Sequence, residues 1–188
     1  MDHYAERLVS LVEGSEWFME ILHTARSVDL PDWAVAAGAV RTLVWDHLHG
    51  FESPSRVNDV DVLFFDPVRK DEDAIVDVLA ARSPGFHWDA KNQAFIHEWY
   101  LRKLSVEIPP YTSTEAGIAG FVETATAVGL RLEGDDSLRV IAPYGLDDLF
   151  ELQLRPNLDA PDPSYFDKRV TAKNWIEQWP RLRIVPPN

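Results

Sequence analysis

The chain has 188 residues, of which 46% are hydrophobic and 11% aromatic, so it can bury a sizeable core and is not disordered. Its net charge of -13 opposes the phosphate backbone and argues against bulk DNA or RNA binding, although a locally basic groove could still admit a specific RNA. The absence of cysteine excludes disulfides and cysteine-bound zinc.

The sequence also shows no membrane or targeting signal. The amphipathic, acid-containing segment 1–20 lacks the basic and apolar regions of a signal peptide, and no apolar run approaches the ~20 residues that a membrane span requires. We therefore expect a cytoplasmic protein with no membrane partner.

Hydrophobic spacing and turn residues predict an alternation of helices and strands. The first half is expected to contain helices at 4–26 (two, divided at Gly14-Ser15), 39–48, 71–82 and 92–104, and strands at 32–38, 59–65 and 86–91. The second half is expected to contain helices at 113–122, 145–154 and 165–179, and strands at 127–132 and 138–142. The residues expected to face inward from 71–82 are Ile75, Val78 and Leu79, and those from 92–104 are Phe95, Ile96, Trp99, Tyr100 and Leu104.

An Asp-Val-Asp motif, Asp59-Val60-Asp61, stands at the head of an apolar run. Because strand side chains alternate, Asp59 and Asp61 point to one face, with Cα atoms roughly 6.6 Å apart at the strand rise of about 3.3 Å per residue. Two such carboxylates repel each other unless a cation lies between them. The motif therefore indicates a site for a divalent metal ion, naturally Mg²⁺ with a phosphate.

A third carboxylate could come from Asp66, Asp89 or Glu107. Asp66 has the wrong parity and precedes a proline, where an Asp-Pro turn is the ordinary explanation, and Glu107 is isolated. Asp89 lies mid-strand with Lys91 on the same face, which makes it the preferred choice.

A possible anion site lies upstream of these acids. Gly38, between a strand and a helix, lets a ligand approach the backbone, and the helix N-terminus offers free N–H groups. Arg41 on the first turn could bind a phosphate bidentately. The basic residues Lys168-Arg169 and Lys173 are interpreted as solvated helix faces.

This arrangement resembles the DNA polymerase beta nucleotidyltransferase superfamily, and more closely a small bacterial nucleotidyltransferase-like family, over residues 30–183. The residues that carry the resemblance are Ala37-Gly38-Ala39-Val40-Arg41, Trp45-Asp46, His49-Gly50, Asn58-Asp59-Val60-Asp61, Lys91-Asn92-Gln93-Ala94, His97, Thr124-Ala125-Thr126-Ala127-Val128, Pro143-Tyr144-Gly145-Leu146-Asp147-Asp148-Leu149 and Arg155-Pro156. Ala39 stands where the superfamily usually has serine.

The resemblance implies an α/β (mixed α+β) fold, a short mixed sheet flanked by helices with a C-terminal α/β extension. We expect one domain over 1–188, with its core at about 30–105, its extension at 106–188 and a linker at 156–164.

The implied reaction is transfer of a nucleoside monophosphate from a nucleoside triphosphate to an unknown small-molecule, protein or RNA hydroxyl, releasing pyrophosphate. Asp59, Asp61 and Asp89 would be catalytic and hold two Mg²⁺ ions, with Mn²⁺ as a substitute. The expected nucleotide-binding residues are Gly38, Ala39, Arg41 and Lys91. The alternative is a non-catalytic module that keeps the fold and binds nucleotide or acts in a complex.

Other motifs fit poorly. A haloacid-dehalogenase phosphatase has its apolar strand before the acids, an EF-hand loop needs glycine after them, and His97-Glu98 lacks the second histidine of a zinc protease.

Overall fold

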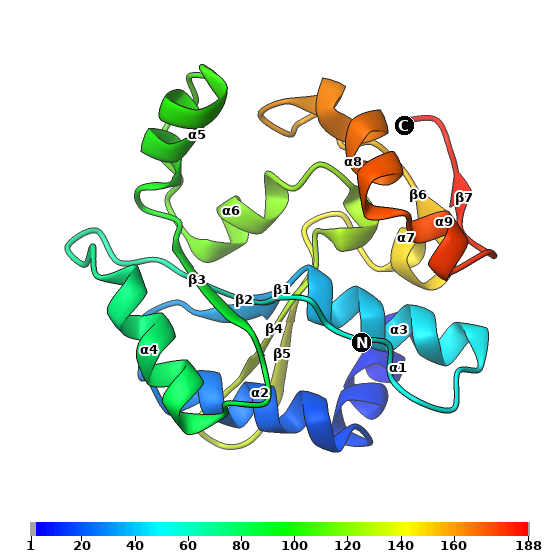
Figure 1. The fold of residues 1–188 in the computed structure, drawn as a ribbon, viewed down its shortest axis with the longest axis horizontal. Helices are drawn as coiled ribbons and strands as arrows, with labels where there is room; N and C mark the ends of the chain where they lie inside the picture. The colour runs from blue at the N-terminus through cyan, green and yellow to red at the C-terminus, as the bar shows by residue number, and fades with distance from the viewer. Residues whose placement is uncertain (1–2, 188) are drawn as a thin grey trace.

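Residues 3–187 are described by a computed structural model, in which a five-stranded mixed sheet is flanked by helices (Figure 1). The strand order is β3-β2-β1-β4-β5, and only β2 and β3 run parallel to each other within this sheet. The expected fold class, mixed α+β with a short mixed sheet between helices, is confirmed.

The strands and helices follow each other along the chain as the hydrophobic spacing predicts in outline. The strands are β1 (Ala34–Ala36), β2 (Val60–Phe64), β3 (Trp88–Asn92), β4 (Gly129–Leu132), β5 (Leu138–Ile141), β6 (Gln153–Leu154) and β7 (Arg183–Ile184). The α-helices are α1 (His3–Glu13), α2 (Glu16–Arg26), α3 (Gly38–His49), α4 (Glu72–Arg82), α5 (Ile96–Leu104), α6 (Thr114–Ala119), α7 (Asp147–Phe150), α8 (Phe166–Lys173) and α9 (Trp175–Gln178). Short 3₁₀ helices lie at Thr124–Thr126 and Pro163–Tyr165.

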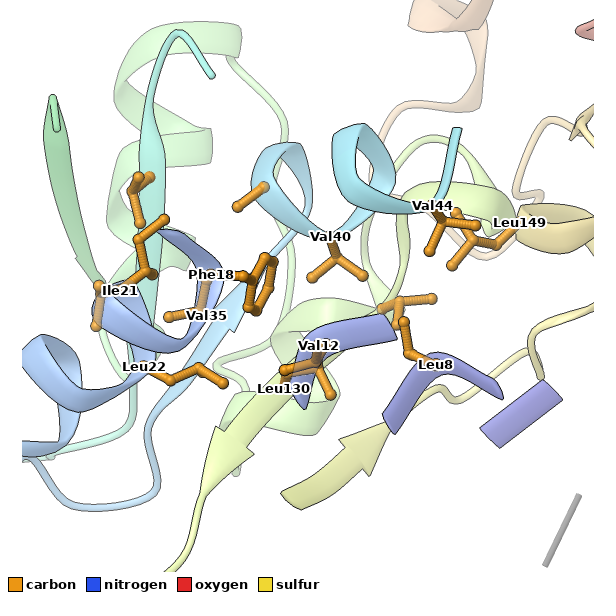
Figure 2. Packing of buried hydrophobic residues seen from close by; sticks show 14 of the residues in the cluster. Leu8, Val12, Phe18, Ile21, Leu22, Val35, Val40, Val44, Leu130 and Leu149 are labelled. Carbon is orange, nitrogen blue, oxygen red and sulfur yellow. The ribbon is translucent and has the colours of Figure 1, made fainter. Parts of the chain in front are cut away.

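The main hydrophobic core lies on the sheet face covered by the N-terminal helices. Figure 2 shows Leu8 and Val12 of α1, and Phe18 of α2, packing toward Val35 of the sheet and Val40 of α3. Val60, Val62 and Phe64 of β2 also belong to this cluster, because alternate residues of a strand share a face. The intervening residues Asp61 and Leu63 therefore face the opposite side.

The opposite face of the sheet carries a much smaller apolar cluster. Ala34 and Ala36 of β1 and Leu63 of β2 pack there with Ile118 of α6. In Figure 1, α5, α6 and α8 all lie on this side, whereas α1 and α2 lie on the other. The functional residues predicted on β2 and β3 thus face the side with the thinner cover.

Several predicted element boundaries are confirmed. Gly14 and Ser15 separate α1 from α2, and Ser113 caps α6 by accepting a hydrogen bond from the Ala116 N–H at 3.1 Å. The strand after the Asp-Val-Asp motif is also present, although Asp59 lies just before its first residue.

Other details of the sequence prediction were wrong. Val78 of α4 is exposed, and α5 begins at Ile96 and buries none of its residues, so its apolar side chains do not belong to the core. The predicted final helix is two helices, because Asn174 adopts a left-handed φ of 52° between them. The pairing of β6 with β7 was not predicted.

Tryptophans pack the C-terminal helices against α3. The rings of Trp175 and Trp179 lie edge-on to that of Trp45, with centroids 5.7 and 5.1 Å away. The Trp179 indole N–H donates to Asp46 Oδ1 at 2.8 Å, and the backbone N–H of Ser55 donates to Asp46 Oδ2 at 2.6 Å. One buried carboxylate therefore joins α3, the loop before β2 and the end of α9.

The segment 156–164, expected as a linker, is packed against the body of the protein. Asn157 is buried, and its side-chain amide donates to the carbonyl oxygens of Ala119 and Phe121 at 2.8 and 2.7 Å. Among the described residues, no helix has the length and apolar character needed to cross a membrane.

Candidate active site

Two of the predicted carboxylates lie side by side on the thinly covered sheet face. Asp61 of β2 and Asp89 of β3 are direct partners in the parallel register, and Ala36 at the end of β1 is the other neighbour of Asp61. Asp59 precedes β2, and its carboxylate pairs with His87 at 2.8 Å. The fold thus brings Asp61 and Asp89 together and places Asp59 beside them at the strand's start.

Asp61 is held in an environment that disfavours its ionised form. Burial and the neighbouring Asp89 carboxylate raise the pKa of Asp61 from 3.8 to about 6, and Asp59 adds to this effect. The Arg41 and Arg169 guanidinium groups act in the opposite direction but do not offset it. An additional cation at this position would relieve the repulsion.

The turn between β1 and α3 brings the backbone close to these acids. Ala37 adopts φ 53° and ψ −104°, a conformation that a non-glycine residue rarely occupies, and its N–H donates to the Val128 carbonyl. A Cβ on Gly38 would lie 3.4 Å from the Asp59 carbonyl oxygen and 3.5 Å from an Arg41 nitrogen. A helix N-terminus therefore lies directly against the Asp-Val-Asp segment.

Arg41 is largely enclosed and lies among other charges. Its guanidinium lies over the Trp175 ring, 4.8 Å from the centroid, and its Nε is buried without a hydrogen-bond partner among the described residues. Burial and the nearby Arg169 lower the pKa of Arg41 to about 10. Two cations so close to each other favour binding of an anion between them.

Arg169 of α8 is a candidate site residue that the sequence analysis missed, since it lines the cavities at Asp61. It was interpreted as part of a solvated helix face, but its Nε lies 2.8 Å from the carboxylate of Glu123, which is fully buried, and it lies over Trp175. The only signal in the sequence was its place six residues before Trp175 and ten before Trp179 in an amphipathic segment. That spacing alone could not reveal which residues it meets.

Two cavities meet at Asp61. The first, which we call the polar cavity, has a volume of about 160 Å³ and lies between the turn before α3 and the helices α8 and α9. Its lining includes Gly38, Arg41, Arg56, Asp59, Asp61, Arg169 and Lys173. Four cationic side chains in so small a space are suited to a polyphosphate.

The second cavity, which we call the aromatic cavity, has a volume of about 280 Å³ and lies between β2, β3, α5 and α6. Its lining includes Asp61, Asp89, Lys91, Gln93, Trp99, Tyr100, Tyr111, Phe121 and Arg169. Ala37, Asp61 and Arg169 line both cavities, so ligands in the two cavities would contact the same residues.

Three of the four predicted nucleotide-binding residues line a cavity, and one does not. Gly38 and Arg41 line the polar cavity, and Lys91 lines the aromatic cavity, where its ammonium lies 2.8 Å from Asp89. Ala39 lines neither cavity, because its side chain is fully buried in the main core. Ala39 can contribute to ligand binding only through its backbone N–H.

The three acids have the donor chemistry of a magnesium site but are not gathered into one. Within residues 3–187, no group of three or more Asp, Glu or His side chains is placed to hold a metal ion. The reason is that Asp59 and Asp89 turn toward His87 and Lys91. All four side chains are at least 37% exposed, so these pairs contribute little and are easily exchanged for a stronger cation. The donor set therefore fits divalent metal ions.

A family model described as nucleotidyltransferase matches residues 23–184, which is most of the chain. The chain belongs to this nucleotidyltransferase family. Its structure is similar to one described as revealing a CCA-adding enzyme head domain, with 30% identity, a TM-score of 0.81, and coverage of 96% of this chain and 95% of that one. The family resemblance and the assignment as a nucleotidyltransferase enzyme are thus confirmed.

More distant structures share the fold alone. They include a CCA-adding enzyme with CTP (19% identity, TM-score 0.55, 96% of this chain and 43% of that one) and the Thermotoga maritima CCA-adding enzyme with tRNA (16% identity, TM-score 0.52, 88% and 37%). The nucleotidyltransferase described here spans less than half the length of those enzymes. Comparison with proteins of curated function gives no match.

Proposed function

We propose that this nucleotidyltransferase moves a nucleoside monophosphate from a nucleoside triphosphate to a hydroxyl group, with pyrophosphate as the leaving group and metal ions as cofactors. The observation that carries the proposal is the register pairing of Asp61 with Asp89 where a cationic cavity and a helix N-terminus meet. Membership in the family supports nucleotidyl transfer in general. The structure described as a CCA-adding enzyme complexed with CTP has the same fold, which is consistent with a triphosphate donor.

The polar cavity would hold the triphosphate. Arg41 and Arg169 offer guanidinium groups to the β- and γ-phosphates, and Lys173 of α8 adds a third cation at the rim. Gly38 leaves room for a phosphate oxygen to approach the backbone N–H groups at the start of α3. These residues would fix the α-phosphorus near Asp61.

Asp59, Asp61 and Asp89 would hold two Mg²⁺ ions, or Mn²⁺ in their place. Such ions supply charge neutralisation of the phosphates and a lowered pKa of the attacking hydroxyl. Asp89 can accept the hydroxyl proton, because its carboxylate lines the aromatic cavity, where the acceptor hydroxyl would approach Asp61. Lys91, released from Asp89, would remain close enough to stabilise charge on the phosphate.

The test is equilibrium binding of each of the four labelled nucleoside triphosphates in the presence of Mn²⁺ or Mg²⁺. We expect the wild type to bind at least one of them, and the double variant Asp59→Ala plus Asp61→Ala to lose at least tenfold in affinity. The matched control is Asp77→Asn, which removes one exposed carboxylate from α4, outside both cavities.

Metal dependence has its own readout. Removing the metal with EDTA should weaken triphosphate binding to the wild type about as much as the double substitution does. It should have little further effect on the double variant. Wild type that binds no triphosphate with either metal would contradict the proposal. The alternative of a module that binds nucleotide without catalysis predicts binding without pyrophosphate release for any hydroxyl acceptor.

A further inference from the structure

The aromatic cavity is lined by aromatic side chains of α5 that are not buried in the hydrophobic core. Trp99 of α5 is 38% exposed and no residue of α5 is buried, yet the helix presents Trp99 and Tyr100 to the cavity. Figure 1 shows α5 standing at the edge of the molecule, on the same side of the sheet as α6. An exposed tryptophan and a half-buried tyrosine that belong to neither apolar cluster, gathered beside a carboxylate pair, indicate a ligand site.

Gly117 of α6 and Gly120, which follows the helix directly, shape the opposite wall of this cavity. A Cβ on Gly117 would lie only 2.1 Å from Gln93 Oε1, and a Cβ on Gly120 would lie 2.1 Å from the Tyr111 hydroxyl oxygen. Gln93 is almost fully buried, and its side-chain amide donates to the Lys91 carbonyl at 3.1 Å. The glycines therefore make room for two polar side chains that line the cavity.

Hydrogen bonds from residues outside the cavity also fix the wall formed by α6 and the residues after it. Both the Tyr144 hydroxyl and the Asn157 amide donate to the Ala119 carbonyl, at 2.9 and 2.8 Å. Asn157 also donates to the Phe121 carbonyl at 2.7 Å, and Phe121 is itself a cavity residue. These hydrogen bonds fix the α6 wall of the cavity in place.

The charges in the aromatic cavity balance. Asp61 and Asp89 face Lys91 and Arg169 within the same lining, so these four side chains give an organic ligand no net charge to match. The net charge of -13 on the whole protein further disfavours a long polyanion. The aromatic lining instead favours a flat, uncharged ring that can stack on Trp99 or Tyr100.

We infer that the aromatic cavity binds the acceptor, and that the acceptor is a small, uncharged molecule with a flat ring and a hydroxyl group, of the size of a nucleoside. This inference rests on the proposed function for the reaction itself. The acceptor hydroxyl gives its proton to Asp89, and its oxygen forms a bond to the α-phosphorus. The bond from the α-phosphorus to the bridging oxygen breaks, and pyrophosphate leaves with the electron pair.

The test is saturation-transfer NMR with adenosine, cytidine, guanosine and uridine as ring-bearing probes and ribose as the probe without a flat ring. We expect at least one nucleoside to bind the wild type and ribose not to bind. Trp99→Ala should weaken nucleoside binding at least tenfold, because it removes the stacking surface. Leu101→Ala is the matched control, since Leu101 lies on the same helix, is 57% exposed and lies outside this cavity.

Triphosphate affinity, measured on the same variants, separates this inference from the proposed function. Unchanged triphosphate binding in Trp99→Ala, together with lost nucleoside binding, supports an acceptor site. Loss of both triphosphate and nucleoside binding in Trp99→Ala would show that the cavity holds the donor's base, and would overturn the assignment. Nucleoside binding that does not depend on Trp99 would also overturn it. A short single-stranded RNA with a free 3′-hydroxyl that binds when no nucleoside does would also overturn it.

Nucleoside binding needs no triphosphate, so saturation-transfer NMR measures it with no triphosphate present. If the wild type binds no triphosphate, the proposed function fails, while a ring-binding cavity that depends on Trp99 remains directly observable.

Discussion

At the scale of single residues, Asp61 is the side chain on which function and stability oppose each other. Its carboxylate lies between Asp59 and Asp89 and is enclosed by the sheet and α3, so ionisation is unfavourable without an added cation. A structural role alone would favour a neutral residue here. A carboxylate at this position is what a metal-binding site requires.

The metal-free protein should therefore be stabilised by Asp61→Asn at neutral pH. The pKa of Asp61 rises from 3.8 to about 6 on folding, so the unfolded state loses its proton first and stability falls as the pH rises through this window. The full effect, present above pH 6, is at most about 3 kcal/mol from the shift of about two units. As the pH falls below 3.8 the carboxyl becomes protonated in both states and the effect vanishes.

Thermal denaturation in EDTA at pH 4 and pH 7.5 measures this difference between Asp61→Asn and wild type. Asp77→Asn serves as the control and should leave the melting temperature close to that of the wild type at both values. Equal stability of wild type and Asp61→Asn at pH 7.5 would show that Asp61 is not electrostatically strained.

At the scale of secondary-structure elements, α6 is placed by what its glycines allow. The helix has only six residues, and Gly117 within it and Gly120 directly after it leave the space that the Gln93 and Tyr111 side chains occupy. Larger side chains at these two positions would push the helix away from the sheet, enlarge the gap over β2 and β3, and displace the cavity lining.

Gly117→Ala should reduce the free energy of unfolding by about 1–3 kcal/mol, because the new methyl group would overlap the Gln93 carboxamide. Chemical denaturation measures this loss. Gly134→Ala is the control, since a Cβ there meets nothing within 4 Å.

The double variant Gln93→Ala plus Gly117→Ala tests the cause. If the overlap with Gln93 is responsible, the double variant should be less destabilised than the sum of the two single variants. Simple additivity would place the origin of the loss elsewhere in α6.

At the scale of the whole molecule, the C-terminal helices complete the polar cavity, and a small number of buried contacts hold them there. Arg169, Lys173 and Trp175 come from α8 and α9, whereas Gly38 and Arg41 come from α3. The hydrogen bond from Trp179 to Asp46 and the packing of Trp45 against the two C-terminal tryptophans join these segments.

Trp179→Phe should therefore lower both stability and triphosphate affinity. The substitution keeps a ring but removes the N–H donor to the buried Asp46 carboxylate, a loss of about 1.5–3 kcal/mol for a hydrogen bond to a charged group. Denaturation and triphosphate titration measure the two effects. Trp17→Phe is the matched control in the N-terminal helix pair, outside both cavities, and should leave triphosphate affinity unchanged.

Affinity that stays at the wild-type value in Trp179→Phe while stability falls would show that α8 and α9 keep their place without this hydrogen bond. The polar cavity would then depend on tryptophan packing alone.

The sequence by itself determined the local elements and the nature of the chemistry. Alternating and helical spacing depend only on neighbouring residues, so the strand after Asp59, the turn at Gly38 and the helix that carries Arg41 could all be predicted. The parity of strand residues also placed Asp61 and Asp89 on the cavity side of the sheet, and the motif spacing indicated the family.

Only the tertiary structure decided which distant residues share the site. Arg169 lies more than 100 residues from Asp61 and reaches it because the tryptophans of α9 pack on α3. The aromatic residues of α5 have a helical spacing typical of core packing, yet they line a cavity because no other element covers that helix. Burial and partners depend on contacts between segments far apart in the chain, and the pattern within one segment does not contain that information.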